Sequence, residues 1–589
     1  MNARATLGTG FGSYDNYFYN YLADIGTSIS GNDFRKSMGK SQSYISTFTL
    51  NYDKAIGKHH FKALAGYEAR KSDFSSMELS NRNALVEVPQ SSDLVKDVNT
   101  AVSRSNQGNI YERILSQFAR VEYAYADKYL LTVNVRRDGY ATRFGPNNKI
   151  GVFPGVSAGW KISDEAFMKS IPFISFLKLR AGYGKLGNSP GFDFAFSGDY
   201  SQGFSADLSR NGGNRQSSIG LTTKLPNPNI QWEEVATVNV GIDGALLNNK
   251  LNFNLDYYVR ETRKMIYPVG IPASAGSGSS VPFNIGQMTN NGFEFNLEWR
   301  DKMNNGLGYT VGLNGGFNRN KLISLDPSLE RLQITSGGLV EIHQGQPNRS
   351  EPGYALGQFF GYVVDGIYQK DAATTEKRPF IASNDYVPRA GDLIYRDLNN
   401  DGKINEDDRA FIGNPWPKLT YGINLSANYK GFDVRLFFAG SYGNKIYNGY
   451  ESMASTFFSD YTTTKAIFGT SGFNGNGVTD MPRVGTITDL DKNGNWGAIS
   501  SYHVQNGSYL RMRNVQLGYN VSRTLATKMG MSSMRVFLMA DNLFTITGYK
   551  GLNPEVPARD GSFLQLGLDN ANQLYPMSRL VSMGVNLEF

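Results

Sequence analysis

The 589-residue sequence contains no cysteine, which excludes disulfides and thiolate metal sites. It also lacks any run of about 18 apolar residues, the length that a membrane-spanning helix requires. The missing run does not exclude a spanning barrel, because each barrel strand presents only every second residue to lipid. The N-terminus, MNARATLGTGFG, has no charged region followed by an apolar core. We therefore expect either a cytoplasmic protein or a sequence whose true beginning is missing.

Features of enzymes and of nucleic-acid-binding proteins are scarce. The net charge of +7 is modest for this length, and the basic residues do not collect into a stripe. The four histidines show no metal-ligand spacing such as HExxH, and MGKS at 38–41 lacks the first glycine of a phosphate-binding loop. We therefore expect no catalytic site and no nucleic-acid partner.

Residues that favour β structure are abundant instead. The chain has 36 Phe, 34 Tyr and 65 Gly, which suit pleated surfaces and tight turns. In residues 248–260, NNKLNFNLDYYVR, apolar and polar residues alternate as in a strand with one oily face. The members of that oily face are Leu251, Phe253, Leu255, Tyr257 and Val259.

Short and long connections alternate between roughly sixteen strand candidates. The short turns lie near Gly57, Ala126–Lys128, Asn248–Asn249, Asn304 and Lys430–Gly431. The long polar segments are 13–42, 73–113, 189–232, 324–417, 448–507 and 550–577. If the last strand runs inward, every short turn falls on one side and every long segment on the other. This arrangement is typical of an outer-membrane barrel with short periplasmic turns and long external loops.

The final strand shows the same two faces. Its predicted lipid-facing residues are Val581, Met583, Val585, Leu587 and Phe589. The alternative is a large soluble β protein whose apolar face is covered by a second sheet. Lipid is the better interpretation, because a closed barrel also satisfies every edge strand. The sequence thus predicts an all-β, transmembrane antiparallel barrel over residues 1–589 in a Gram-negative outer membrane.

The segment 397–408, DLNNDGKINEDD, follows the pattern of a calcium-binding loop. Gly402 would supply the tight turn, and Ile404 would pack inward. The predicted ligands are Asp397, Asn399, Asp401, the carbonyl of Lys403, and Asp408 in the twelfth place. Asp408 is shorter than the usual glutamate, and no amphipathic helices flank the loop. A turn rich in Asp and Asn that is held by its own backbone contacts is the alternative.

Aromatic residues of the external segments are candidates for ligand stacking. They are Trp416, Tyr447, Tyr450 and Tyr461. Packing among the loops is the more common role for any one such residue. We expect a structural calcium as the only cofactor, and no catalytic residue.

Several stretches resemble the barrel of SusC/RagA-type TonB-linked outer-membrane transporters of the Bacteroidetes. The stretches are 118–168, which begins FARVEYAYADKYLLTVNVRRDGY, together with LKLRAGYGKLGN (177–188), LPNPNIQWEEVATVNVGID (225–243) and 391–448, which begins GDLIYRDLNNDGKI. GSYLRMRNVQLGYNV, DNLFTITGYKGLNPEV and YPMSRLVSMGVNLEF complete the series. The resemblance covers the chain from about residue 43 to its end.

The resemblance implies a 22-stranded barrel that contains a plug and imports oligosaccharides or peptides. It implies a SusD-like lipoprotein lid and coupling to TonB–ExbB–ExbD as partners, together with outer-membrane lipid. The sequence departs from this pattern because it shows no plug, TonB box or signal, and about six strands are missing. We therefore expect the C-terminal part of a transporter, with a long external loop at 324–417. A passive porin and a secreted β-rich binding or adhesion protein are the competing interpretations.

Overall fold

The structure is a computed structural model of residues 1–589. It describes the chain except for residues 20–22, 25–28, 31–32, 83–103, 192, 207–215, 272–279, 327–345, 372–385, 455–480, 485–492, 559–561 and 570–575. Tyr461 and parts of the predicted long loops therefore lie outside the described residues. Two compact units make up the chain. Unit 1 comprises Met1–Trp160, Ala181–Thr237 and Thr262–Ile285, and unit 2 comprises Lys161–Arg180, Val238–Glu261 and Gly286–Phe589.

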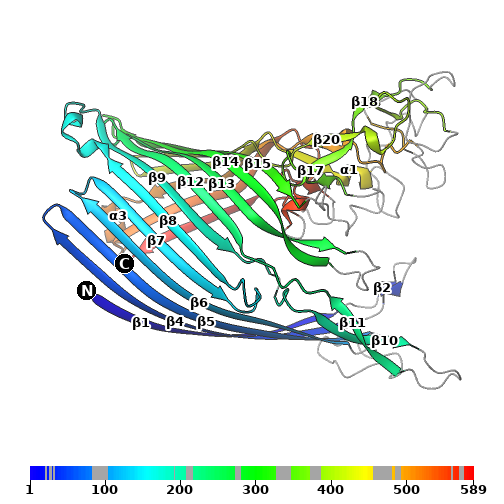
Figure 1. Ribbon diagram of the computed structural model, residues 1–589. Coiled ribbons are helices and arrows are strands. Elements are labelled where there is room, and N and C mark those ends of the chain that lie inside the picture. Colours follow the sequence, from blue (N-terminus) through cyan, green and yellow to red (C-terminus); the bar gives the residue numbers. More distant parts are fainter. Residues whose placement is uncertain are drawn as a thin grey trace. The chain divides into compact units, whose positions relative to one another are not determined.

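Sixteen long strands belong to one antiparallel sheet, as the sequence predicts (Figure 1). Their order is β1-β4-β5-β6-β7-β8-β9-β12-β13-β14-β15-β21-β22-β25-β26-β28. Some of these strands lie in unit 1 or have their first residue in it. They are β1 (Asn2–Tyr19), β4 (Asp33–Ile56), β5 (His59–Arg82), β6 (Arg104–Tyr125), β7 (Tyr129–Tyr140), β8 (Ile150–Lys161), β12 (Glu233–Leu246) and β14 (Ser280–Lys302). The others are β9 (Ile174–Asn188), β13 (Leu251–Gly270), β15 (Gly308–Leu325), β21 (Leu419–Tyr429), β22 (Phe432–Tyr442), β25 (Tyr509–Asn520), β26 (Ser533–Thr547) and β28 (Leu580–Glu588).

The remaining elements are short and belong to the connections. The strands are β2 (Ala23–Asp24), β3 (Ile29–Ser30), β10 (Asp199–Ala206), β11 (Gln216–Lys224), β16 (Asn348–Arg349), β17 (Gln358–Tyr362), β18 (Val364–Ile367), β19 (Leu393–Tyr395), β20 (Arg409–Gly413), β23 (Lys445–Asn448), β24 (Val504–Asn506) and β27 (Leu568–Asp569). The helices are α1 (Gly449–Ala454), α3 (Arg523–Lys528), η1 (Ile162–Asp164), η2 (Ala166–Met168), η4 (Glu406–Asp408), η6 (Ser501–His503) and η8 (Phe563–Gln565). None of the helices in the described part of the chain has the length and apolar character needed to cross a membrane.

All five predicted tight turns join neighbouring strands of the sheet. Gly57 links β4 to β5, and Ala126 and Asp127 link β6 to β7 with positive φ angles of 50° and 56°. Lys430 and Gly431 link β21 to β22, also with positive φ. Such left-handed residues match the twist of a tight β-hairpin. Gly57, Asn248, Asn249 and Gly431 adopt this conformation readily, whereas Ala126 and Lys430 adopt it although it is uncommon for their residue types.

In two of the predicted long segments, the connection between the strands is shorter than expected. The segment 13–42 was predicted as a loop, but β1 continues to Tyr19 and β4 begins at Asp33. The segment 73–113 likewise contains the end of β5 and the start of β6. In this segment β5 and β6 remain paired through polar residues, for example Ser75 opposite Asn109. Polarity alone does not distinguish such solvated strand ends from loops.

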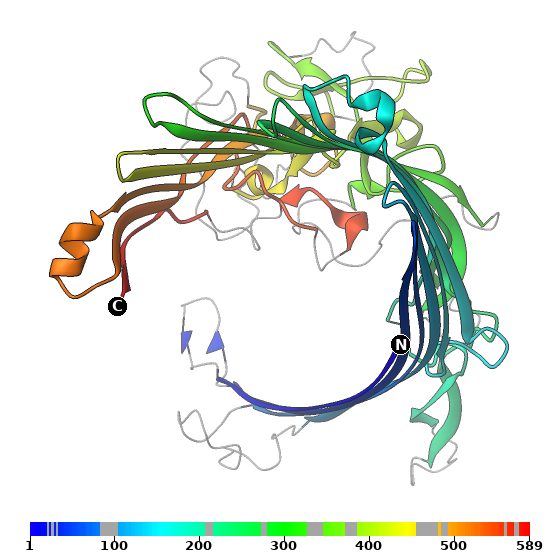
Figure 2. The ribbon, with the colours of Figure 1, turned by 90° about the vertical axis from the view of Figure 1, so that its left-hand side faces the viewer.

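In unit 1, Figure 2 shows β1 and β4–β8 side by side as one curved layer, coloured blue to cyan. One face of this layer carries an apolar row across four strands, made of Ala63, Val121, Val133 and Val156 in register. Towards the short turns the same face carries a ladder of stacked rings. Its members are Phe61 and Tyr123 at 4.8 Å, Tyr125 and Tyr129 at 6.3 Å, and Tyr129 and Trp160 at 6.3 Å. An aromatic girdle of this kind is found at the membrane–water interface of barrels.

Unit 2 repeats this pattern. Registers place six apolar residues in one row: Val311, Leu425, Leu436, Val515, Ala540 and Val581. At the turn end of that face, Phe432 lies against Tyr519 with ring centroids 4.7 Å apart. The opposite face is polar, with Asp433 bound to Arg535 at 2.6 Å and Asn428 opposite Asp433.

The buried cores do not lie on the apolar strand faces. In unit 1, Tyr140 of β7 and Phe153 of β8 pack on the opposite face with Trp232 of a connection. In unit 2, Phe359, Tyr447, Ile499 and Leu568 form one core, all from connections. Figure 1 shows β17, β18, β20 and α1 gathered beyond the ends of β14 and β15. The last strand's apolar residues remain exposed by contrast, Val581 at 65% and Met583 at 78%. No second sheet covers the apolar face among the described residues, which favours lipid as its partner.

Candidate functional site: a cavity on the polar face

A cavity of unit 2 lies on the polar face of the sheet and has a volume of about 950 Å³. Strands β13, β14, β15, β21, β22 and β25 form its wall, and the connections contribute Pro415, Pro417, Pro554–Pro557 and Leu566–Gly567. The wall contains both polar and apolar side chains, and its polar strand residues are there because every second residue of a strand points to the same side. Those residues are Asn254, Asp256, Glu294, Asn296, Asn314, Thr420, Ser441, Asn444 and Glu555.

Asp256 is fixed in the wall by a polar cluster. Arg180 donates to Asp256 at 2.5 Å and to Asp243 at 3.0 Å, so one guanidinium bridges carboxylates of two strands. Asn239 donates to the other oxygen of Asp256 at 3.0 Å. These bonds compensate the negative charge of Asp256 and fix the orientation of its carboxylate in the cavity wall.

Glu555 also lines the cavity. Arg511, which is almost fully buried, binds Glu555 at 2.5 Å and donates to Asn553 at 2.8 Å. Arg513 also pairs with Glu555. These contacts tie the connection after β26 onto strand β25, where its two prolines and Glu555 line the cavity. Glu294 is the remaining carboxylate of the wall and has no ion-pair partner among the described residues.

The predicted ligand-stacking residues do not meet in this cavity. Tyr447 is fully buried in the core with Phe359, so it packs within the loops and the stacking prediction is wrong for it. Trp416 donates its indole N–H to the carbonyl of Leu356 at 2.7 Å and lines a second cavity. Tyr450 is half-buried in α1. The residues that line the main cavity were not singled out from the sequence, although their alternation with apolar residues was visible.

The predicted calcium loop folds around its own backbone. Gly402 has a φ of 81° and Ile404 packs in a core with Leu393, as expected. Asp397 accepts a hydrogen bond from the amide of Gly402 at 2.8 Å. Buried Asp408 accepts bonds from the amides of Leu398 at 2.8 Å and Asn405 at 2.9 Å. Asp408 thus caps η4 and closes the loop.

The fit of this loop to calcium is partial. Asn399 donates its amide to Asp401 at 3.2 Å, so these two predicted ligands face each other. The backbone conformation of the loop suits the ion, and Asp397 keeps one buried carboxylate oxygen without a hydrogen-bond partner. Within the described residues, however, no three His, Cys, Asp or Glu side chains gather closely enough to hold a metal. Calcium binding therefore stays a prediction, as does the carbonyl role of Lys403.

A substitution separates the two roles of the loop. Asp408→Ala removes the acceptor for two buried amides, which costs about 1–3 kcal/mol for each unsatisfied group. We expect cleavage of segment 396–413 by a protease to accelerate at least tenfold, measured by mass spectrometry of the fragments. Because the lost bonds are internal, the acceleration should be the same in calcium and in chelator. A wild-type loop whose cleavage slows when calcium is added would show that the ion also binds.

Comparisons with known proteins agree with this arrangement. Residues 2–349 match the family model described as TonB dependent receptor-like, beta-barrel. The chain is 31% identical to TonB-dependent receptor P3 of Formosa agariphila and 27% identical to TonB-dependent receptor SusC of Bacteroides thetaiotaomicron. Each alignment covers 92% of this chain but only 52% and 49% of the relative. The chain thus spans about half the length of these curated relatives.

Solved structures show the same fold. The structure of the RagAB peptide transporter superposes with a TM-score of 0.81 at 22% identity, covering all of this chain and 60% of that one. The RagAB peptide importer in its open-open state gives 0.79 at the same identity.

The sheet, its two faces and these matches define an outer-membrane β-barrel protein. The chain belongs to the TonB-dependent receptor β-barrel family, and its relatives include SusC, as the motif resemblance implied. Members of this family reside in the bacterial outer membrane, which confirms the predicted location.

Proposed function

We propose that this chain forms the barrel of a TonB-dependent importer for oligosaccharides or peptides. The observation that carries the proposal is the polar cavity of about 950 Å³ between the strand wall and the connections. It has the size of cavities that enclose a small oligomeric ligand. Except for Asn444 and Glu555, its carboxylates and side-chain amides are on strands, so they would meet a solute with little reorganisation.

The lining favours neutral, hydrogen-bonding solutes. Side-chain amides of Asn254, Asn296 and Asn314 can both donate and accept, as the hydroxyls of sugars and the amides of peptides require. The rings of Phe437 and Tyr509 supply apolar contact surface in the same wall. RagAB, which shares the fold, is a peptide transporter. Both solute classes therefore remain within the proposal.

The proposed mechanism follows from the family. A SusD-like lipoprotein would cover the ends of the strands that carry the long connections and would hold the solute above the cavity. TonB–ExbB–ExbD would then supply the energy for passage. The tie between Glu555 and the two arginines of β25 supports this arrangement, because it holds one connection in place beside the route.

Adjacent residues on opposite faces test the route. Asn314 lines the cavity, whereas Leu313 lies on the apolar face. We expect Asn314→Trp to lower whole-cell uptake of the transported oligosaccharide or peptide at least tenfold, because the indole obstructs the cavity. Leu313→Trp should leave uptake unchanged, because tryptophan is tolerated beside lipid.

Uptake is measured in the complete protein and is divided by its abundance in isolated outer membranes. Equal uptake by both variants would show that the solute does not pass through this cavity. Uptake that persists after the proton-motive force is dissipated would favour a passive porin over a TonB-dependent importer.

A further inference from the structure

A second cavity of unit 2, with a volume of about 680 Å³, has a basic lining. It lies where β15 extends past the end of its pairing with β21. The last pair is Phe317 opposite Leu419, the first residue of β21, and the following β15 residues have no partner in that strand. The connections fill this edge: the amide of Leu322 donates to the carbonyl of Tyr354 at 2.8 Å. Trp416 also lines the cavity.

Three cations and no carboxylates line this cavity among the described residues. The cations are Arg319, Lys321 and Lys418, and each is exposed. None of the three has an ion-pair partner in the described part of the chain. In the main cavity the lining has three carboxylates and no Lys or Arg. The basic lining of the second cavity is therefore suited to an anion.

Aromatic rings adjoin Arg319 and Lys321 on the apolar face. Phe293 and Phe317 are opposite each other on β14 and β15, and both line the cavity. Tyr257 of β13 also lines it and points away from the polar face, because its neighbour Tyr258 bonds Asn318 there. These three rings are 37–52% exposed. Binding of a soluble anion would not require exposed aromatic rings beside the cations. At the membrane–water interface, exposed aromatic rings are common because they contact the lipid head groups.

The height of the cations along the strand matches the edge of a membrane. Trp299 and Tyr309 share a hydrogen bond of 3.2 Å at the turn end of β14 and β15, where an inner girdle would lie. Ten residues separate Tyr309 from Arg319 on the same face, or about 34 Å of strand. At the usual strand tilt of roughly 40° this spans about 25 Å, the height of the apolar band of such barrels. Arg319 and Lys321 thus lie level with lipid head groups.

We propose that this second cavity binds the phosphorylated head group of an outer-leaflet lipid. Arg319, Lys321 and Lys418 contact the phosphates, and Tyr257, Phe293 and Phe317 contact the boundary between sugar or glycerol and acyl chains. Long basic side chains reach towards head groups in this way while their stems cover apolar surface. Each cation close to a charged lipid surface adds favourable binding, and the rings fix the depth.

The test compares a variant that lacks two cations of the second cavity with a variant that lacks two cations at another site. The complete protein is purified in detergent and titrated with micelles that contain a diphosphorylated glucosamine-based lipid or its dephosphorylated form. We expect the wild-type protein to bind the phosphorylated lipid at least tenfold more tightly. Arg319→Gln combined with Lys321→Gln should abolish this preference, and Lys321→Arg should retain it.

The matched control is Arg523→Gln with Lys528→Gln, which removes two exposed cations from α3. It should bind the lipid as the wild type does. A double variant at 319 and 321 that keeps the preference would overturn the proposal. So would full displacement of the lipid by millimolar inorganic phosphate, because the site would then bind a soluble anion. Unchanged melting temperatures of all variants in detergent show that any loss of binding is not a loss of folding.

Discussion

Leu425→Arg is expected to prevent stable insertion of the protein into the outer membrane, whereas Asn424→Arg should be tolerated. The two residues are neighbours in β21, but Leu425 belongs to the apolar row with Leu436, and Asn424 lies on the polar face opposite Phe437. An arginine on the lipid face near the bilayer midplane costs about 2–4 kcal/mol, whereas the polar face accepts charge. The two variants add the same side chain to the same strand, so only the face differs.

The measurement is the amount of each variant in isolated outer membranes, together with its resistance to unfolding in detergent. We expect Leu425→Arg to fall to a small fraction of wild type and Asn424→Arg to stay close to it. Equal losses would mean that the two faces have the same environment, which would contradict lipid contact. Equal tolerance would favour the secreted, soluble interpretation of the sequence.

The faces and the turns could be predicted from sequence because both are local. A period of two in residues 251–259 identifies the two sides of a strand, and Gly or Asn marks positive φ at the hairpins. Gly402 and Ile404 were correctly placed for the same reason, since a tight turn followed by an inward residue has a fixed short spacing.

The cavities could not be predicted because they join residues that are distant in sequence. Asp256 and Glu555 line one wall, yet about half the chain separates them. The compensating arginines are equally remote, since Arg180 reaches Asp256 across the sheet. Tyr447 was misjudged for a related reason: an aromatic residue in a polar loop has the same appearance in sequence whether it is exposed or, as here, forms the loop's own core. Only pairing across the sheet and between connections decides these cases.

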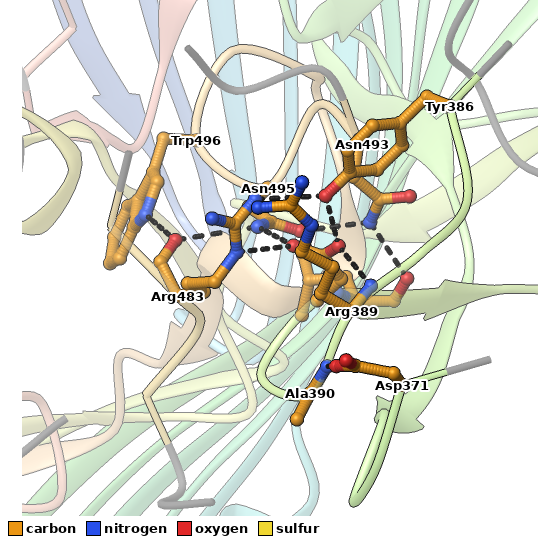
Figure 3. A network of polar contacts seen from close by, with 10 residues as sticks. Asp371, Tyr386, Arg389, Ala390, Arg483, Asn493, Asn495 and Trp496 are labelled. Atoms are coloured by element: carbon orange, nitrogen blue, oxygen red, sulfur yellow. Dashed lines mark hydrogen bonds and ion pairs between the residues drawn. The ribbon is translucent and has the colours of Figure 1, made fainter. Parts of the chain in front are cut away.

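A buried polar network in the connections of unit 2 provides the second large expected effect. Asp392 is completely buried and accepts hydrogen bonds from Tyr386 at 2.5 Å and from the amide of Arg389 at 2.8 Å. Asn495 donates to its other oxygen at 2.8 Å, and Arg483 pairs with it at 3.4 Å. Figure 3 shows Tyr386, Arg483 and Asn495 converging from separate segments. One carboxylate thus joins residues 386–392 to Arg483 and Asn495.

Asp392→Ala is expected to release these segments. Removing one partner of a buried ion pair costs about 3–5 kcal/mol, because Arg483 and the donors of Tyr386 and Asn495 lose their acceptor. Hydrogen–deuterium exchange of the amides at 391–396 should accelerate by about a hundredfold. The matched control is Asp365→Ala, which breaks an exposed pair with Arg396 in the same region and should cost less than about 1 kcal/mol. Similar exchange in both variants would show that burial of Asp392 contributes nothing.

The same network should weaken in alkali. Burial, and secondly the hydrogen bond to Asp392, raise the pKa of Tyr386 above its ordinary value of 10. The folded state therefore holds the phenol proton more tightly than the unfolded state does. Its contribution is complete below about pH 10 and is lost as the pH rises further. Exchange at 391–396 should accelerate above pH 10 beyond its ordinary base-catalysed increase in wild type, and Tyr386→Phe should lack this additional acceleration because it has no proton to lose.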